Sequence, residues 1–399
     1  MNFANPVFVY ASIWLTVLML HSLRLLAVLV PANPASVFLI ISTCVIFLLL
    51  FLALRLTNYA GSLSKPNHDE TLINREVNFL EQTAKGLLIA WMLGTILTIV
   101  YSGGVPLYWM LKGSGRDYRD FGIPTFGGFI AAINTFLGVS YYILYHYKRR
   151  KKFLILMILM LLWPILVVSR GNFTYMLLEI VGAYLIINKG RLRTFAVMLV
   201  GLIAFVYIFG VIGDFRLGIE NAAVFKKSIL NQQYVEIADY LPSGLLYVYA
   251  YVTTPFNNVV YNIENLIPTY IPYYSTIFLL PSVVRGFFFT GGNYALEMVS
   301  ETFNTFTFFA GYLKDFGLFF TIMIVTIIQG GSVLLYFKAM QGRIAYILAY
   351  SVAFQCLVLS VFNDNFTMQM SIFQIIYALY LGIRYKKMCK LNHGTENAA

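Results

Sequence analysis

Three arginines of this sequence lie beside or within apolar segments. Arg170 is in a Ser-Arg-Gly-Asn turn between two apolar runs, Arg216 follows Gly-Asp-Phe, and Arg285 interrupts a stretch of Val and Phe residues. A guanidinium binds a phosphate through two parallel hydrogen bonds, and its field is weakly screened near a bilayer. These arginines are therefore candidate ligands of a lipid pyrophosphate. The alternative is that they snorkel to the membrane surface or pair with Asp214.

The segment 213–315 carries acidic side chains that could serve as a general base, the group that removes a proton from an attacking hydroxyl. Our candidates are Glu264, Glu297 and Asp315, and the sequence alone does not rank one above the others. None of the four His residues lies in this segment. A histidine base is therefore excluded there, and a histidine-bound metal is not expected.

Two further charged residues, Arg24 and Glu179, lie inside long apolar runs. An ion within a membrane is costly and normally faces a cavity or a partner. If the first run is helical through Val30, His21 lies one turn from Arg24 on the same face. Two interpretations stay open: a structural Arg24–Glu179 pair, or a cavity in which Arg24 helps to bind the pyrophosphate.

Long apolar helices must position these residues. The chain is 59% hydrophobic and 11% charged, well outside the range of soluble proteins. Because a membrane-spanning helix needs about 20 apolar residues, we predict an all-α polytopic membrane protein with about 10 spans. The predicted spans are 8–30, 36–54, 86–104, 125–146, 153–168, 172–188, 194–212, 316–337, 344–362 and 367–383.

Basic residues cluster after every second apolar run, and 18 of the 28 Lys and Arg residues fall on one side. By the positive-inside rule this side is cytoplasmic, so both termini are cytoplasmic and the chemistry belongs to the opposite, outer face. The net charge of +11 thus reflects topology and not nucleic-acid binding. The 18 residues are Arg55, Lys65, Arg75, Lys85, Lys148, Arg149, Arg150, Lys151, Lys152, Lys189, Arg191, Arg193, Lys338, Arg343, Arg384, Lys386, Lys387 and Lys390.

The chain reads as a single membrane domain, 1–399, with unequal loops. The stretch 55–85 is a cytoplasmic loop, while 105–124 and 213–315 lie on the outer side. Loops as long as 213–315 are usually functional. Its apolar parts indicate interfacial or re-entrant helices that cover a cavity.

Short glycine-rich motifs recur at the outer ends of the predicted spans. Ser-Gly-Gly-Val-Pro-Leu at 102–107 leaves the third span, and Asp-Tyr and Phe-Gly-Ile-Pro within 117–124 precede the fourth. Ser-Arg-Gly at 169–171 joins the fifth and sixth spans, and Asn-Thr-Phe-Thr, Gly-Tyr and Asp-Phe-Gly within 304–317 precede the eighth. In this order the chain, from about 85 to 340, resembles the Wzy-type O-antigen polymerases.

The resemblance implies a glycosyltransferase of the bacterial inner (cytoplasmic) membrane whose active site faces the periplasm. Donor and acceptor would be undecaprenyl-pyrophosphate-linked oligosaccharides, with the bilayer and a chain-length regulator as further partners. Arg170, Arg216 and Arg285 would stabilise the leaving pyrophosphate. No cofactor is implied, because the lipid pyrophosphate is already activated.

Two other functions fit the same layout. The related O-antigen ligases resemble it but typically place a functional His in the large outer loop, which this chain lacks. A flippase for the same lipid-linked sugar would be expected to have more spans, shorter loops and charges spread through its bundle. The sequence therefore favours the polymerase.

Overall fold

The structure is a computed structural model that describes residues 3–57, 70–188, 203, 206–207, 210–211, 214, 219–273, 275–276, 279–280, 284, 287, 296–300 and 305–396. Within these residues the chain forms helices, turns and loops but no strand, which confirms the predicted all-α class.

The described helices are α1 (Pro6–Ser22), α2 (Pro34–Leu56), α4 (Glu70–Ser102), α5 (Pro106–Leu111), η1 (Tyr118–Asp120), α6 (Phe126–Lys148), α7 (Lys151–Leu166), α8 (Arg170–Asn188), α10 (Ile219–Ile229), η2 (Gln232–Ile237), α11 (Ser243–Asn265), α13 (Phe309–Ala339), α14 (Ile344–Val358), η4 (Leu359–Val361) and α15 (Gln369–Glu396).

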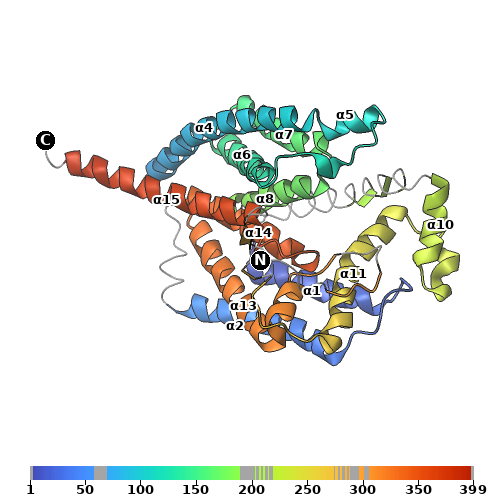
Figure 1. The fold of residues 1–399 in the computed structure, drawn as a ribbon. Helices are drawn as coiled ribbons and strands as arrows, with labels where there is room; N and C mark the ends of the chain where they lie inside the picture. Colours follow the sequence, from blue (N-terminus) through green and yellow to red (C-terminus); the bar gives the residue numbers. More distant parts are fainter. Residues whose placement is uncertain are drawn as a thin grey trace.

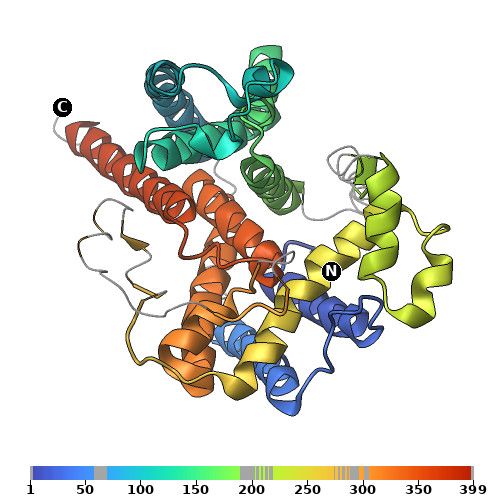
Figure 2. The ribbon, with the colours of Figure 1, turned by 45° about the vertical axis from the view of Figure 1, so that its right-hand side comes forward.

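These helices form three layers (Figures 1 and 2). The middle layer contains α8, α14 and α15, and nearly every residue of α14 is buried. One side is covered by α4, α5, α6 and α7, and the other by α1, α2, α11 and α13. The end of α15 and the beginning of α4 lie at the left of Figure 1, whereas α5 and α10 lie at the right. Segments predicted to be cytoplasmic and segments predicted to be outer thus lie at opposite ends.

Five segments are long and apolar enough to cross a membrane: 34–56, 71–111, 126–148, 309–339 and 344–361. The helix α1 is apolar but shorter, with 17 residues. Further predicted spans coincide with α7, α8 and α15, and most of 194–212 lies outside the described residues. The apolar helices identify a membrane-associated protein.

The first apolar run is helical for less of its length than predicted. The helix α1 ends at Ser22, and the chain beyond it pairs with residues 229–231: Ala27 N–H donates to the Ile229 carbonyl (2.9 Å), and Asn231 N–H donates to the Leu25 carbonyl (2.8 Å). These bonds replace the helical ones, and Leu26 is buried in a cluster with Ile229 and Leu230. Because the helix ends early, Arg24 is exposed, with a left-handed φ of 47°.

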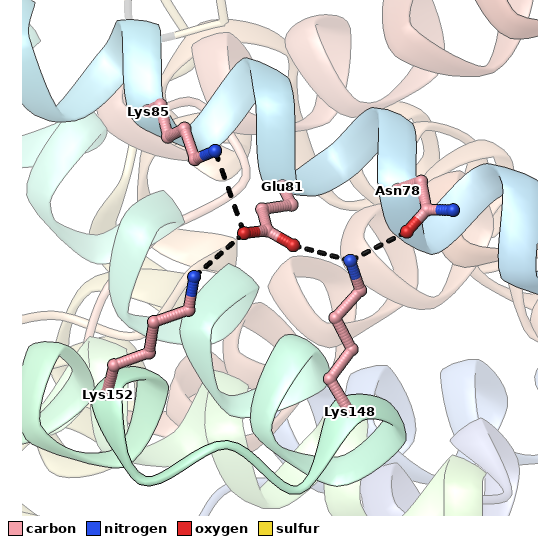
Figure 3. A network of polar contacts seen from close by, with 5 residues as sticks. All are labelled: Asn78, Glu81, Lys85, Lys148 and Lys152. Atoms are coloured by element: carbon pink, nitrogen blue, oxygen red, sulfur yellow. Dashed lines mark hydrogen bonds and ion pairs between the residues drawn. The ribbon is translucent and has the colours of Figure 1, made fainter.

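The segment 55–85, predicted as a loop, is helical from Glu70 onward and continues directly into the apolar part of α4. Glu81 in this charged first part accepts hydrogen bonds from Lys148 and from Lys152, the latter at 2.9 Å (Figure 3). Lys148 Nζ also donates to Asn78 Oδ1 (2.7 Å). The bond from Lys148 is the main reason why the pKa of Glu81 falls to about 2. This network fixes α4 to the α6–α7 turn.

Replacing Glu81 by Gln is expected to destabilise the protein by about 2 kcal/mol at pH 7, because two ammonium groups lose their counter-ion. The pKa of Glu81 lies below its ordinary value of 4.5, so the carboxylate stabilises the folded state above pH 4.5 and loses this effect as the pH falls toward 2. Thermal unfolding in detergent measures the change. Lys85→Gln is the control, because Lys85 is 68% exposed and 3.7 Å from Glu81; an equal loss in both variants would contradict the prediction.

A backbone break divides α13 into two parts. Gly317 has φ 76° and ψ −177°, so Phe309–Phe316 and the long helix that follows are separate segments. The outer segment is joined to its neighbour by a bond from Thr269 N–H to the Lys314 carbonyl (2.9 Å). A Cβ at position 317 would lie 3.0 Å from Pro268. Only glycine combines this backbone conformation with this close approach.

Gly317→Ala is expected to lower the free energy of unfolding by about 1 kcal/mol or more, because it adds a left-handed alanine and a contact with Pro268. Thermal unfolding in detergent tests this. The matched control is Gly331→Ala in the same helix, where an added Cβ meets nothing within 4 Å. If the two variants unfolded at the same temperature, the break would not require glycine.

Candidate functional site

The outer end of α14 is held by aromatic packing. The Trp14 ring lies 4.8 Å from the Phe309 ring, and its Nε1–H donates to Ser360 Oγ (3.1 Å). Phe308 N–H donates to the Ser360 carbonyl (2.9 Å). These bonds place the beginning of α13 beside the turn that joins α14 to α15.

That turn carries an acid held by several donors. Asp364 Oδ2 accepts a hydrogen bond from Thr367 Oγ1 (2.8 Å), and its Oδ1 accepts one from Phe366 N–H (3.1 Å). The Tyr312 hydroxyl on α13 is also hydrogen-bonded to this carboxyl. Burial raises the pKa of Asp364 above its ordinary value, and the bonds from Tyr312 and Thr367 limit the rise. The residue as a whole is half-buried.

Asp315 is the second acid of this region and is fully buried. Its Oδ2 accepts bonds from Ser275 N–H (2.7 Å) and Ser275 Oγ (2.8 Å). Tyr312 lies within electrostatic range of both Asp315 and Asp364. The four residues Tyr312, Asp315, Asp364 and Thr367 are called the outer acid cluster below.

An unsatisfied side chain adjoins the outer acid cluster. Asn365 is 1% exposed, yet neither its Oδ1 nor its Nδ2 has a hydrogen-bond partner among the described residues. The hydroxyl of Thr307 is also buried and has no partner among the described residues. Thr307 precedes Phe308, whose N–H is bonded to the α14–α15 turn at Ser360. A buried polar group without a partner costs about 1–3 kcal/mol, and such groups are typical of sites that take up a water or a polar ligand.

Helix α8 brings a cation to this region. Arg170 is its first residue and is exposed. Five residues further along, the Tyr175 hydroxyl donates to Met368 Sδ (3.8 Å), in the same turn as Asp364. Arg170 therefore begins the helix that contacts Met368, the residue after Thr367, and its side chain is exposed.

Three asparagines of α11 hold irregular outer backbone in place. Asn257 Oδ1 accepts a bond from Val30 N–H (2.8 Å), and Asn258 Oδ1 accepts one from Val299 N–H (3.1 Å). The Asn262 side chain is bonded to both backbone groups of Glu297: its Oδ1 accepts from the N–H (3.1 Å), and its Nδ2 donates to the carbonyl (2.7 Å). The side chains of Asn258 and Asn262 thus supply the hydrogen bonds that a neighbouring strand would otherwise give to the backbone of 296–300.

Asn262→Ala is expected to destabilise this attachment by about 2 kcal/mol, because it leaves the N–H and carbonyl of Glu297 unpaired. Amide hydrogen exchange within 296–300 should become faster. Asn265→Ala is the matched control, since Asn265 is exposed on the same helix and makes a 3.4 Å bond to the Tyr261 carbonyl. Unchanged exchange in Asn262→Ala would show that the segment is held by other contacts.

The structure treats the predicted site residues differently. Asp315 joins the outer acid cluster, whereas Glu264 at the end of α11 and Glu297 are exposed, with side chains directed to the surface. Arg216 and Arg285 lie outside the described residues. Arg24 is exposed in the loop after α1 rather than inside a span, and the described ion pairs do not join it to Glu179.

The sequence prediction missed Asp364, Tyr312 and Asn365. Two signals were available: Asn-Asp-Asn at 363–365, in the short segment between the predicted spans 344–362 and 367–383, and the Gly-Tyr motif that contains Tyr312. Asn and Asp are common in turns, and nothing in the local sequence shows that α13 places Tyr312 beside this one.

The motif at 102–107 has a structural explanation. Gly103 and Gly104 have φ of 68° and 138° and end α4, and Pro106 begins α5. Ser102 Oγ accepts a bond from Gly122 N–H (3.0 Å), which connects the later part of the loop 105–124 to the end of α4. These glycines shape the loop.

A shallow apolar hollow lies between α4, α14 and α15 at the opposite end from Asp364, beside Glu76 and Tyr385. The Glu76 carboxylate is fully engaged by Arg343 (3.0 Å) and by Ile344 N–H (2.8 Å). It has no free capacity for chemistry, so the hollow is not a candidate active site.

Comparisons of this chain with family models, with curated proteins and with solved structures find no match.

Proposed function

We propose that this protein is a membrane glycosyltransferase, a repeat-unit polymerase of the bacterial inner membrane. It would join undecaprenyl-pyrophosphate-linked oligosaccharides at the periplasmic face, with about 10 spans and the loops 105–124 and 213–315 on that face. The observation that carries the proposal is the outer acid cluster, which joins α13 to the α14–α15 turn. The Arg170-bearing helix contacts the same turn at Met368.

The chemistry needs a base for the acceptor hydroxyl. Asp364 is suited to this task because burial raises its pKa toward the working pH and because part of its surface is exposed. The acceptor oxygen forms a bond to the anomeric carbon of the donor, the bond to the pyrophosphate oxygen breaks, and the hydroxyl proton passes to Asp364. Tyr312 and Thr367 hold the carboxyl in position.

The leaving group needs a cation. The freed pyrophosphate gains negative charge as the glycosidic bond breaks. An exposed guanidinium can bind this pyrophosphate by donating two hydrogen bonds. Arg170 would serve in this role, with Arg216, Arg285 and Arg24 as further proposed contributors. Asp315 is bound by Ser275 and lies within electrostatic range of Tyr312, and we assign it a structural role.

Deleting the gene should leave cells whose lipopolysaccharide core carries a single repeat unit, because ligation continues without polymerisation. Complementation with Asp364→Asn or Arg170→Ala should restore about a hundredth of the polymer or less, since a general base or one oxyanion donor contributes about a hundredfold. Arg170→Lys should keep part of the activity, because charge is retained while the guanidinium fork is lost. A gel of surface polysaccharide measures all of these.

Glu236→Gln, at an exposed position of η2, is the control and should restore normal ladders. Protein levels in the membrane must be equal in all strains. Bare core with polymer accumulating on the lipid carrier would instead indicate a ligase, and unchanged ladders in the deletion strain would exclude both functions.

A further inference from the structure

A carboxylic acid and an amide face each other in the interior of the bundle. Gln374 Nε2 on α15 donates to Glu179 Oε1 on α8 (3.2 Å). Glu179 is 1% exposed and Gln374 is 2% exposed. This contact joins α8 to α15 below the outer acid cluster, and neither residue has a part in the proposed reaction.

Each of these side chains has one unsatisfied oxygen. Glu179 Oε2 and Gln374 Oε1 are both buried and have no hydrogen-bond partner among the described residues. A carboxylate and an amide carbonyl are both acceptors, so an ionised Glu179 leaves both atoms without a donor. The ion pairs of the described residues supply no cation to Glu179, and a lone buried carboxylate is very costly.

We propose that Glu179 is a proton-binding site: the folded protein carries a proton on Glu179 Oε2, which it donates to Gln374 Oε1. A neutral acid and an amide then make two reciprocal hydrogen bonds. Gln374 Nε2–H donates to Glu179 Oε1, and Glu179 Oε2–H donates to Gln374 Oε1. One proton thereby satisfies both orphan oxygens and removes the buried charge. The pair connects α8, which begins with Arg170, to α15, which begins next to Asp364.

The surroundings of Glu179 contain few other titratable groups. From α14 the Cys356 thiol lies within electrostatic range, and on α8 itself Tyr175 lies one turn earlier. On α6 the titratable residue that contacts α8 is Tyr142. Its ring lies 6.3 Å from the ring of Tyr184, which is more than one helical turn beyond Glu179. The lysines of α7 are in its first turn, and α15 presents the amide. No neighbour described here supplies a positive charge that would keep Glu179 ionised.

Infrared spectroscopy of the purified full chain in detergent at neutral pH tests the proposal without any substrate. The wild type should show the carbonyl band of a protonated carboxylic acid. Glu179→Gln, which keeps the shape and still allows reciprocal bonding, should fold normally and lose this band. Gln374→Leu should keep the acid but shift its band to higher frequency, because the carbonyl loses its hydrogen bond.

Stability as a function of pH gives a second readout. Folding takes up a proton at Glu179, so wild-type stability should decrease as the pH rises above about 4.3, where the unfolded carboxyl ionises, until the folded acid itself ionises. This slope should be smaller in Glu179→Gln. Glu236→Gln should alter neither the band nor the slope. A band that survives in Glu179→Gln, or that disappears in Asp364→Asn instead, would overturn the proposal. Because no reaction is measured, these outcomes are independent of whether the protein is a polymerase.

Discussion

The outer half of this protein depends on satisfying irregular backbone beside a bilayer. Lipid offers no hydrogen bonds, so non-helical segments at this depth must find partners within the protein. Helix α11 supplies them through the side chains of Asn257, Asn258 and Asn262. An amide can accept and donate at once, which is why asparagine can pair with both groups of one peptide. These bonds, together with those between residues 25–27 and 229–231, fix the loop after α1, and they attach the segment 296–300 to α11.

The two ends of the bundle use charge differently. At the end predicted to be cytoplasmic, Glu76 and Glu81 are fully engaged by Arg343, Lys148 and Lys152, and these contacts join α4 to the helices beside it. At the other end Asp364 has hydroxyl and N–H donors but no recorded ion pair among the described residues. Fully compensated charge stabilises structure, whereas a carboxyl bound only by neutral donors keeps the capacity to exchange a proton.

The length of the apolar runs predicted much of the fold. Long apolar runs gave the positions of α2, α6, α13 and α14, because a span is a local property of about 20 residues. The early end of α1 was not predictable in this way. It depends on backbone bonds between residues 25–27 and residues 229–231, which are remote in sequence and carry no periodic signal.

The candidate site shows the same division. Asp315 was predicted as one of the acids of the segment 213–315 that could serve as a base, and it lies in the outer acid cluster. Asp364 was not, because its importance arises from Tyr312 and Thr367, of which only Thr367 is a sequence neighbour. The Arg24–Glu179 pair was considered because both charges lie in apolar runs. Glu179 is instead bonded to Gln374, an uncharged residue that a search for opposite charges does not find.

The break at Gly317 separates the outer segment of α13, with Tyr312 and Asp315, from the part long enough to cross the bilayer. A continuous helix transmits any change of its tilt to both ends. Bilayers differ in thickness by a few ångströms, and spanning helices adapt to this mainly by tilting. With a joint at the surface, the lower part of α13 can follow the lipid while the acids keep their register with Ser275 and the α14–α15 turn. In the proposed enzyme the site would thereby be insulated from the thickness of the surrounding membrane.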